Sequence, residues 1–265
     1  MRPKLDILDI SSAIGCNLQC KGCNHFSNYF APTSQLDTDL LIKDIETILP
    51  RVNIGRVSII GGEPLLNPRC EEIVNACRSN TDSPVYLYTN ALLLLQNEVW
   101  IRKALEDPRV YLRVSVHLPH IVDIIKEFNH PKVLVTEHHT GQDRWFNSIK
   151  KRDGKVYPYN QNKPAKSFKV CSCPNTQLYN GKLWKCPNTA FLRELLSVTE
   201  QEDADEWQEY IVDGLPVDCS DEELTKFCTR STLPERVCNM CTSKPLHFSA
   251  AIQEQTKRKV IYTYK

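Results

Sequence analysis

The stretch Cys16-Asn17-Leu18-Gln19-Cys20-Lys21-Gly22-Cys23 places three cysteines within eight residues. A loop this short cannot reach two separate centres, so its thiolates are expected to bind a single one. Zinc would need a fourth nitrogen or sulfur ligand to complete its tetrahedron, and a cubane iron–sulfur cluster is usually held by four thiolates. Three thiolates leave one iron of such a cluster open to a ligand from outside the protein, and an open position marks a metal site that does chemistry. A zinc loop is the alternative that the spacing alone permits.

The composition is that of an ordinary soluble globular chain. Of its 265 residues 41% are hydrophobic and 25% are charged. The net charge of +1 suggests neither a nucleic acid nor an anionic membrane as a partner, and it excludes neither. Asp6 and Asp9 interrupt any apolar core of an export signal. The 12 cysteines are therefore expected to be reduced and partly metal-bound, in a cytoplasmic protein.

Apolar strand-like runs alternate with helical periodicity along the first 140 residues. This order favours βα units around a parallel sheet. A complete eight-unit barrel takes about 250 residues, so the pattern predicts a partial barrel, with its sixth strand near 167–170. Strands are expected at 4–10, 56–60, 85–89, 110–117 and 133–136, and helices at 38–49, 70–78, 98–105 and 121–128.

A second motif, Gly61-Gly62-Glu63-Pro64, directly follows the second expected strand. Paired glycines let the backbone approach a ligand closely. The motif also falls at the carboxyl end of a parallel strand, where barrels of this kind bind their ligands. A tight turn without a ligand is the alternative.

Together, the cysteine triplet and this motif resemble the signature of the radical S-adenosylmethionine (radical SAM) enzymes. The resemblance covers about residues 5–170 and implies an α/β fold, a partial (β/α)6 TIM-like barrel. It further implies a 4Fe–4S cluster on Cys16, Cys20 and Cys23. S-adenosylmethionine would bind its open iron and be cleaved reductively to a 5′-deoxyadenosyl radical, with electrons from a flavodoxin- or ferredoxin-type partner.

The resemblance also implies the contacts to S-adenosylmethionine. Ser115 and His117 lie two residues apart, on one face of the fourth strand; ordinary polar residues of the barrel interior are the alternative. Many members carry an aromatic residue before the third cysteine, where this chain has Gly22, and Phe26 is expected to cover the adenine instead. The expected cofactor contacts are Gly61, Gly62, Glu63, Pro64, Asn90, Ser115, His117 and Phe26.

Seven further cysteines lie between residues 171 and 241. Asn180-Gly181, flanked by strand formers, predicts a two-residue hairpin that brings the cysteines on either side together. Four thiolates suit either a zinc ribbon or a fully ligated iron–sulfur cluster. The spacing resembles the SPASM and twitch extensions of radical SAM enzymes, and the absence of cysteines after Cys241 favours the one-cluster twitch form. Cys173 competes with Cys171, but the expected ligands are Cys171, Cys186, Cys238 and Cys241.

These observations predict a radical SAM core at 1–166 and a small twitch-type cluster domain with a β-hairpin at 167–265. The architecture resembles the 2-deoxy-scyllo-inosamine dehydrogenases, which implies two 4Fe–4S clusters and oxidation of an alcohol on a sugar- or cyclitol-like small molecule. A peptide-modifying maturase, a radical epimerase and a zinc-stabilised binding protein without catalysis remain alternatives. Epimerisation would need a thiol from Cys173, Cys219 or Cys228. The sequence identifies no catalytic base.

Overall fold

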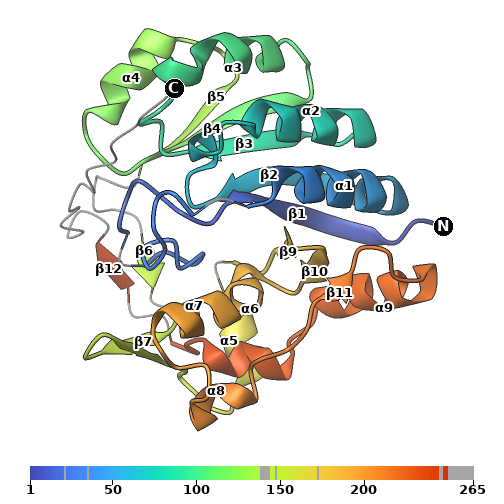
Figure 1. The fold of residues 1–265 in the computed structure, drawn as a ribbon, viewed down its shortest axis with the longest axis vertical. Coiled ribbons are helices and arrows are strands. Elements are labelled where there is room, and N and C mark those ends of the chain that lie inside the picture. Colours follow the sequence, from blue (N-terminus) through green and yellow to red (C-terminus); the bar gives the residue numbers. More distant parts are fainter. Residues whose placement is uncertain are drawn as a thin grey trace.

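An eight-stranded sheet runs through the molecule in the order β11-β10-β9-β1-β2-β3-β4-β5 (Figure 1). The computed structural model describes residues 1–137, 144–146, 148–244 and 247–249 except 21, 35 and 172, with the backbone alone for 144–146 and 247–249. Strands β9, β1, β2, β3, β4 and β5 pair in parallel. Their bounds are β1 Lys4–Ala13, β2 Asn53–Gly61, β3 Val85–Thr89, β4 Val110–Val116, β5 Val133–Glu137 and β9 Thr176–Tyr179.

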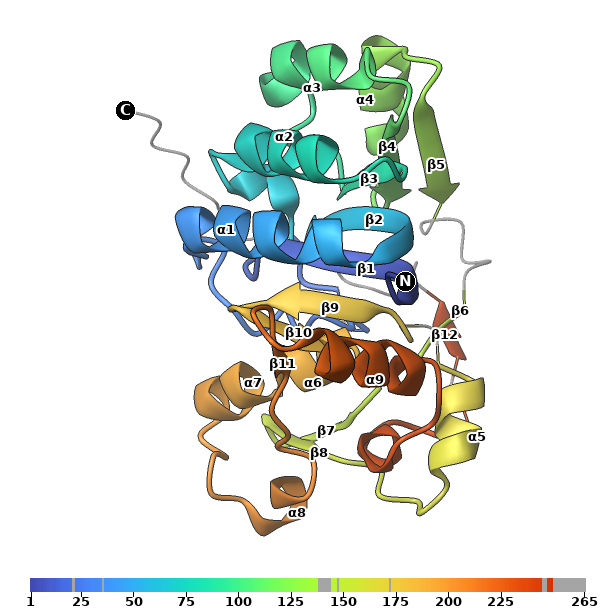
Figure 2. The same cartoon turned by 90° about the vertical axis from the view of Figure 1, so that its right-hand side faces the viewer.

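The helices that connect β1 to β5 lie against one face of that part of the sheet, as Figures 1 and 2 show from two sides. Side chains alternate along each strand, so Leu8 and Ile10 of β1 pack under the helices while Asp9 and Ser11 face the other way. Helix α1 begins after Asp37, whose side chain accepts a hydrogen bond from the amide of Leu40. The helices are α1 Thr38–Ile48, α2 Cys70–Asn80, α3 Glu98–Leu105 and α4 Ile121–Phe128.

The order of these strands and helices confirms the predicted alternation, but the prediction of a sixth strand near 167–170 is wrong. Residues 164–169 form helix α5 (Pro164–Lys169) instead of a strand, because Pro164 occupies the first turn, where its missing N–H costs nothing. The expected partial (β/α)6 barrel is therefore five strands, β1–β5, joined by four helices. The sixth parallel strand of the sheet is β9, on the opposite side of β1.

The predicted hairpin is confirmed. Strands β9 and β10 (Lys182–Trp184) pair antiparallel across Asn180 and Gly181, whose φ angles of 49° and 73° are those a type I′ turn requires. The amide of Gly181 donates to Asp44 on α1 at 2.9 Å. The sheet thus continues across the expected boundary between 1–166 and 167–265.

A second hydrophobic core lies below the sheet. It joins Phe26 and Phe30 of the cysteine loop to residues of the C-terminal part, including Trp207, Tyr210 and Phe191. The remaining elements are β6 Arg144–Phe146, β7 Lys150–Arg152, β8 Lys155–Tyr157, β11 Leu215–Pro216 and β12 His247–Ser249, helices α6 Pro187–Ala190, α7 Leu192–Val198, α8 Asp205–Gln208 and α9 Asp221–Ser231, and the 3-10 turns Leu49–Arg51, Pro64–Leu66, Leu95–Asn97 and Arg236–Met240.

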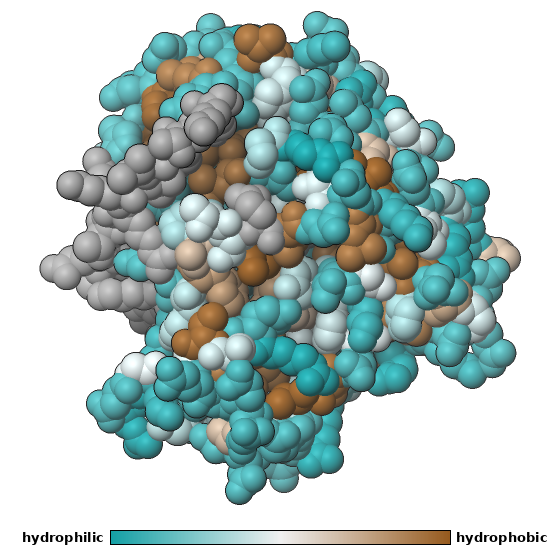
Figure 3. Space-filling model, in the orientation of Figure 1, coloured by the Kyte–Doolittle hydropathy of each residue, from teal (hydrophilic) through white to brown (hydrophobic). Residues whose placement is uncertain are grey.

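The surface seen in Figure 3 is mostly hydrophilic, with hydrophobic residues in small groups. Among the described residues, no helix has both the length and the apolar character needed to cross a bilayer.

Candidate active site and cysteine clusters

The cysteine triplet lies in the loop that leaves the carboxyl end of β1. Cys16 and Cys20 are each 8% exposed, and Cys23 is half-buried. The amide of Leu18 points at the sulfur of Cys16 at 3.4 Å, and the side-chain amide of Asn90 at the end of β3 lies 3.8 Å from the same atom. The loop is therefore fixed at the point where the parallel strands end.

The glycine pair of the second motif holds the start of this loop. The amide of Gly62 donates to the carbonyl of Ala13 at 2.8 Å, and the amide of Glu63 donates to the carbonyl of Gly15 at 3.0 Å. A Cβ at Gly62 would lie 1.9 Å from that Gly15 oxygen. Close backbone packing thus accounts for Gly62 even before a ligand is considered.

Glu63 links the same loop to β3. Its carboxylate is almost fully buried and accepts hydrogen bonds from the Thr89 hydroxyl at 2.6 Å and the Asn90 amide at 2.8 Å. The amide of Leu65 adds a third bond at 3.2 Å. Burial raises the pKa of Glu63 to about 7, against the opposing effect of these donors.

One cavity of about 260 Å³ brings most of the expected residues together. Its wall contains the three cysteines of the triplet with Gly61, Gly62, Glu63, Pro64, Asn90, Ser115 and His117. Phe26 is the exception, since it is 1% exposed, packs in the second core and is not among the described residues that line this cavity. Phe26 is therefore not in the position that the sequence predicted for it, against an adenine in this cavity.

The cavity also contains residues that the sequence did not single out. Asp9 on β1 is 4% exposed, and Asn175 donates to its carboxylate at 3.0 Å. Asp9 stands between Leu8 and Ile10, so the strand alternation already carried the signal of a charge on the face opposite the helices. His25 and Tyr88 line the cavity as well, together with Cys173, which the sequence had already named as a candidate thiol donor.

The donor set of the triplet fits an iron–sulfur cluster. Burial raises the pKa of Cys20 to about 12 and that of Cys16 well above its usual value, so both thiols must lose a proton when they bind metal. Thiolates, buried and with few competing donors, are the ligands that such clusters use. Within the described residues, no three His, Cys, Asp or Glu side chains lie close enough to hold a single metal ion.

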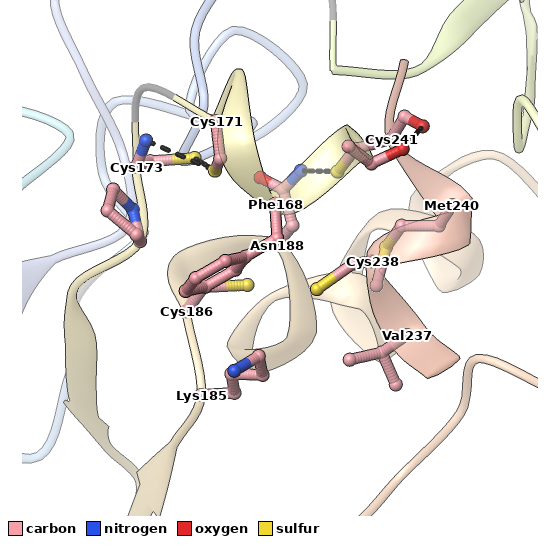
Figure 4. Close-up of a pocket in the computed structure, with 12 residues that line it drawn as sticks. Phe168, Cys171, Cys173, Lys185, Cys186, Asn188, Val237, Cys238, Met240 and Cys241 are labelled. Atoms are coloured by element: carbon pink, nitrogen blue, oxygen red, sulfur yellow. Dashed lines mark hydrogen bonds between the residues drawn. The ribbon is translucent and has the colours of Figure 1, made fainter. Parts of the chain in front are cut away.

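Five cysteines line a second cavity, as Figure 4 shows. They are Cys171, Cys173, Cys186, Cys238 and Cys241, so the four expected ligands are joined by Cys173. The two sulfurs of Cys171 and Cys173 lie 3.8 Å apart, and the hydrogen bond between them lowers the pKa of Cys171 to about 7. The free space is about 20 Å³, room for one water. Thiols are suitable ligands for a cluster, but a cluster held here would require the side chains to move apart.

Two polar side chains support this second cavity. The amide of Asn188 donates to the sulfur of Cys241 at 3.1 Å. The ammonium of Lys185, 9% exposed, donates to the carbonyl of Ser231 at 3.1 Å and lies 3.4 Å from the carboxylate of Glu235. A positive charge beside the thiols favours their ionised form, because it offsets the negative charge that they acquire.

Cys173 is the cysteine that belongs to both cavities. Cys219 and Cys228 line neither of them: Cys228 is buried in the main core, and Cys219 lies next to it. The structure therefore brings one of the three candidate thiol donors to the cavity of the triplet.

The comparisons with known proteins agree with this geometry. The family model of the radical SAM superfamily matches residues 10–158. No curated protein matches the chain in sequence.

Among solved structures, BtrN in complex with AdoMet and 2-DOIA is 17% identical with a TM-score of 0.52, over 92% of this chain and 98% of that one, which shows a shared fold. Another BtrN structure, in an open conformation, is 16% identical with a TM-score of 0.47, over 90% of this chain and 92% of that one. Native anSMEcpe with bound AdoMet is 19% identical with a TM-score of 0.38, and the match spans 51% of this chain and 43% of that one.

Proposed function

Because this chain belongs to the radical SAM superfamily, we propose that it is a radical SAM enzyme that oxidises an alcohol on a sugar- or cyclitol-like small molecule. The family implies a 4Fe–4S cluster and S-adenosylmethionine, and the thiols of Cys16, Cys20 and Cys23 would hold the cluster. When bound, the cluster supplies the electron that cleaves S-adenosylmethionine into methionine and a 5′-deoxyadenosyl radical. The remaining chemistry belongs to the side chains of the cavity.

The residues around the triplet hold the loop and orient its ligands, and they take no part in the reaction themselves. Glu63 and Asn90 fasten the triplet loop to β3, so the thiols keep one arrangement while ligands enter. The motif Gly61-Gly62-Glu63-Pro64 presents its backbone to the methionine end, and Ser115 and His117 face the same cavity from the end of β4. These buried walls keep water away from a reactive radical.

The observation that carries this proposal is the shared wall of the two cysteine-lined cavities. The triplet, the glycine motif and the polar end of β4 meet in one space, and Cys173 separates that space from the second group of thiols. Oxidation of an alcohol needs an acceptor for one electron after hydrogen has been removed. A second 4Fe–4S cluster on Cys171, Cys186, Cys238 and Cys241, as in twitch-type domains, would lie next to the reacting molecule. The fold shared with BtrN, solved with AdoMet and 2-DOIA, supports a substrate of this kind.

The test uses deuterated metabolites. The full chain is reconstituted with iron and sulfide under anaerobic conditions, reduced by flavodoxin or dithionite, and supplied with S-adenosylmethionine and a deuterated small-molecule extract freed of peptides. Deuterium should appear in 5′-deoxyadenosine, and one metabolite should lose one carbon-bound deuterium together with the proton of its hydroxyl group. Transfer from the peptide fraction and none from the small-molecule fraction would contradict the proposal and favour a peptide-modifying enzyme.

Epimerisation is a second candidate, and the position of Cys173 favours it. A thiol that lines the cavity can return a hydrogen atom to the opposite face of a carbon radical, after which a reductant must restore the thiol. The product would keep the mass of the substrate except for one solvent deuteron when the reaction runs in D₂O. Cys173→Ala should abolish that product and leave an oxidised product unaffected.

A further inference from the structure

Two carboxylates line the cavity of the triplet, and their surroundings differ. Both oxygens of Glu63 already accept hydrogen bonds, from Thr89, Leu65 and Asn90. In Asp9 one oxygen accepts from the side chain of Asn175 at 3.0 Å, and the hydroxyl of Ser58 lies close by. Glu63 is therefore committed to holding the loop, whereas Asp9 keeps acceptor capacity towards the cavity.

The burial of Asp9 has no compensating cation. The side chain is 4% exposed, and no ion pair joins it to any described residue. Arg56 on β2 affects it only at longer range, and its guanidinium lies over the ring of Tyr86 at 5.4 Å. Burial consequently raises the pKa of Asp9 to about 6. An unpaired carboxylate that a fold buries at the wall of a cavity is characteristic of a functional site.

The other groups that face this cavity are poorer proton acceptors. Burial lowers the pKa of His25 to about 4, which makes its imidazole a weak base. No lysine or arginine is among the described residues that line the cavity. The thiols of the triplet are committed to metal, and His117 is an expected cofactor contact.

We propose that Asp9 is the catalytic base of the reaction and accepts the hydroxyl proton of the alcohol. The inference rests on the proposed oxidation. Hydrogen-atom abstraction breaks the C–H bond of the carbinol carbon. The O–H bond then breaks, its proton goes to the carboxylate of Asp9, and the carbon–oxygen double bond forms. The abstracted hydrogen atom would go to the 5′-deoxyadenosyl radical, and an iron–sulfur cluster held by the second group of thiols would accept the one electron that remains. The substrate would then lose two electrons in total.

Asn175 positions this base. It lies two residues after Cys173 and just before β9, and its side chain donates to the carboxylate of Asp9. Gln177, two residues further on, donates to the backbone carbonyl of Asp9 and to the hydroxyl of Ser11. The segment that borders the second cavity therefore also fixes Asp9. Asp9 is therefore held by the segment that also carries Cys173, the cysteine that lines both cavities.

The first experiment measures the carboxyl group itself. Infrared difference spectra of the reconstituted full chain with S-adenosylmethionine are recorded for the wild type and Asp9→Asn over pH 4 to 8. A carboxyl band with a midpoint near 6 should be present in the wild type, absent in Asp9→Asn and retained in Asp6→Asn, an exposed control on the same strand. Glu63, whose pKa burial raises to about 7, should give a separate band that all three proteins retain. A midpoint near the ordinary aspartate value, or a band at 6 that Asp9→Asn retains, would overturn the assignment.

The second experiment separates this inference from the proposed function. With the deuterated extract, the ratio of oxidised product to 5′-deoxyadenosine should fall about 100-fold or more in Asp9→Asn, and Asp9→Glu should recover part of it. A ratio that does not change would overturn the role of Asp9 and leave the oxidation intact. Failure of the wild type to form any oxidised product would instead contradict the proposed function, and the infrared midpoint would still decide whether Asp9 is a poised base.

Discussion

At the scale of single residues, the site depends on a buried carboxylate and on a tightly packed glycine. Asp9 is buried without a cation, and burial of an unpaired charge costs stability. Gly62 is packed directly against the backbone of Gly15, where a larger residue does not fit. Each feature makes a separate prediction.

Asp9→Asn should stabilise the protein above pH 6. The pKa of Asp9 in the native state is raised to about 6 from 3.8, so between these values the native state holds a proton that the unfolded chain has released. Stability then falls as pH rises through this window, by up to about 3 kcal/mol. Thermal midpoints of the two proteins should differ at pH 7.5 and converge near pH 4. A variant less stable than the wild type at pH 7.5 would contradict this account.

Gly62→Ala should disturb the triplet loop. A Cβ at this position would lie 1.9 Å from the carbonyl oxygen of Gly15, so the backbone that enters the loop must move. We expect lower iron retention and weaker binding of S-adenosylmethionine, measured after anaerobic reconstitution. Gly154→Asn is the control, because nothing lies within 4 Å of its Cβ and asparagine tolerates its φ of 76°. Equal iron in both variants would argue that Gly62 does not hold the start of the triplet loop in place.

At the scale of elements, the β9–β10 hairpin connects the two cysteine groups. It adds to the sheet beside β1, and the segments on either side of it carry Cys173 and Cys186. Lys185 at the end of β10 reaches the carboxyl end of α9, where its ammonium meets the carbonyls of Arg230, Ser231 and Leu233. One side chain thus joins strand, helix and second cavity.

Lys185→Met should loosen this junction. Carbonyls at the end of α9 would lose their donor, and Glu235 would keep Arg230 as its partner but lose Lys185, at a cost of about 1–3 kcal/mol. Lys182→Met, at the start of β10, removes the more exposed pair with Asp213 and a contact with the ring of Trp184, and it should change stability by less than about 1 kcal/mol. Chemical denaturation of the two variants measures both values. A smaller loss for Lys185→Met than for Lys182→Met would show that the buried contacts do not hold α9.

Elements were predictable where one local signal dominated. Asn180-Gly181 predicted its hairpin, because a type I′ turn needs φ angles that these residues adopt easily. Asp153-Gly154 gives the same signal between β7 and β8, yet the surrounding lysines and arginine hid the strands and the segment was not predicted as a hairpin. Residues 167–170 looked like a strand because the family pattern called for one, whereas Pro164 starts a helix.

The candidate site was predictable in part for a similar reason. Spacing alone identifies a triplet or a glycine pair, and the structure places those residues in one cavity. Asn175 was missed, and Asp9 was not connected with the site, because the two residues meet only through pairing of β9 with β1, a contact between residues more than 160 positions apart. Strand alternation marks Asp9 as a charge on the face opposite the helices, but no local pattern tells which residues it meets there.

At the scale of the whole molecule, two groups of cysteines lie on either side of one shared wall. The sheet brings the triplet to the carboxyl ends of its strands, and the C-terminal part brings five more thiols to the adjacent cavity. Cys70 and Cys77 lie apart from both, buried in the main core. This arrangement predicts one cluster that activates S-adenosylmethionine and one that does not.

The prediction of two clusters with different roles is tested most directly by measuring iron content and 5′-deoxyadenosine formation together on anaerobically reconstituted protein. The wild type should hold about eight irons per chain. Joint replacement of Cys16, Cys20 and Cys23 by Ala should remove half of them and abolish cleavage. Replacement of Cys171, Cys186, Cys238 and Cys241 should also halve the iron but preserve cleavage by dithionite-reduced protein, and Cys70→Ala with Cys77→Ala should preserve both. Full iron or continued cleavage without the triplet, or stoichiometric zinc in the wild type, would contradict the account.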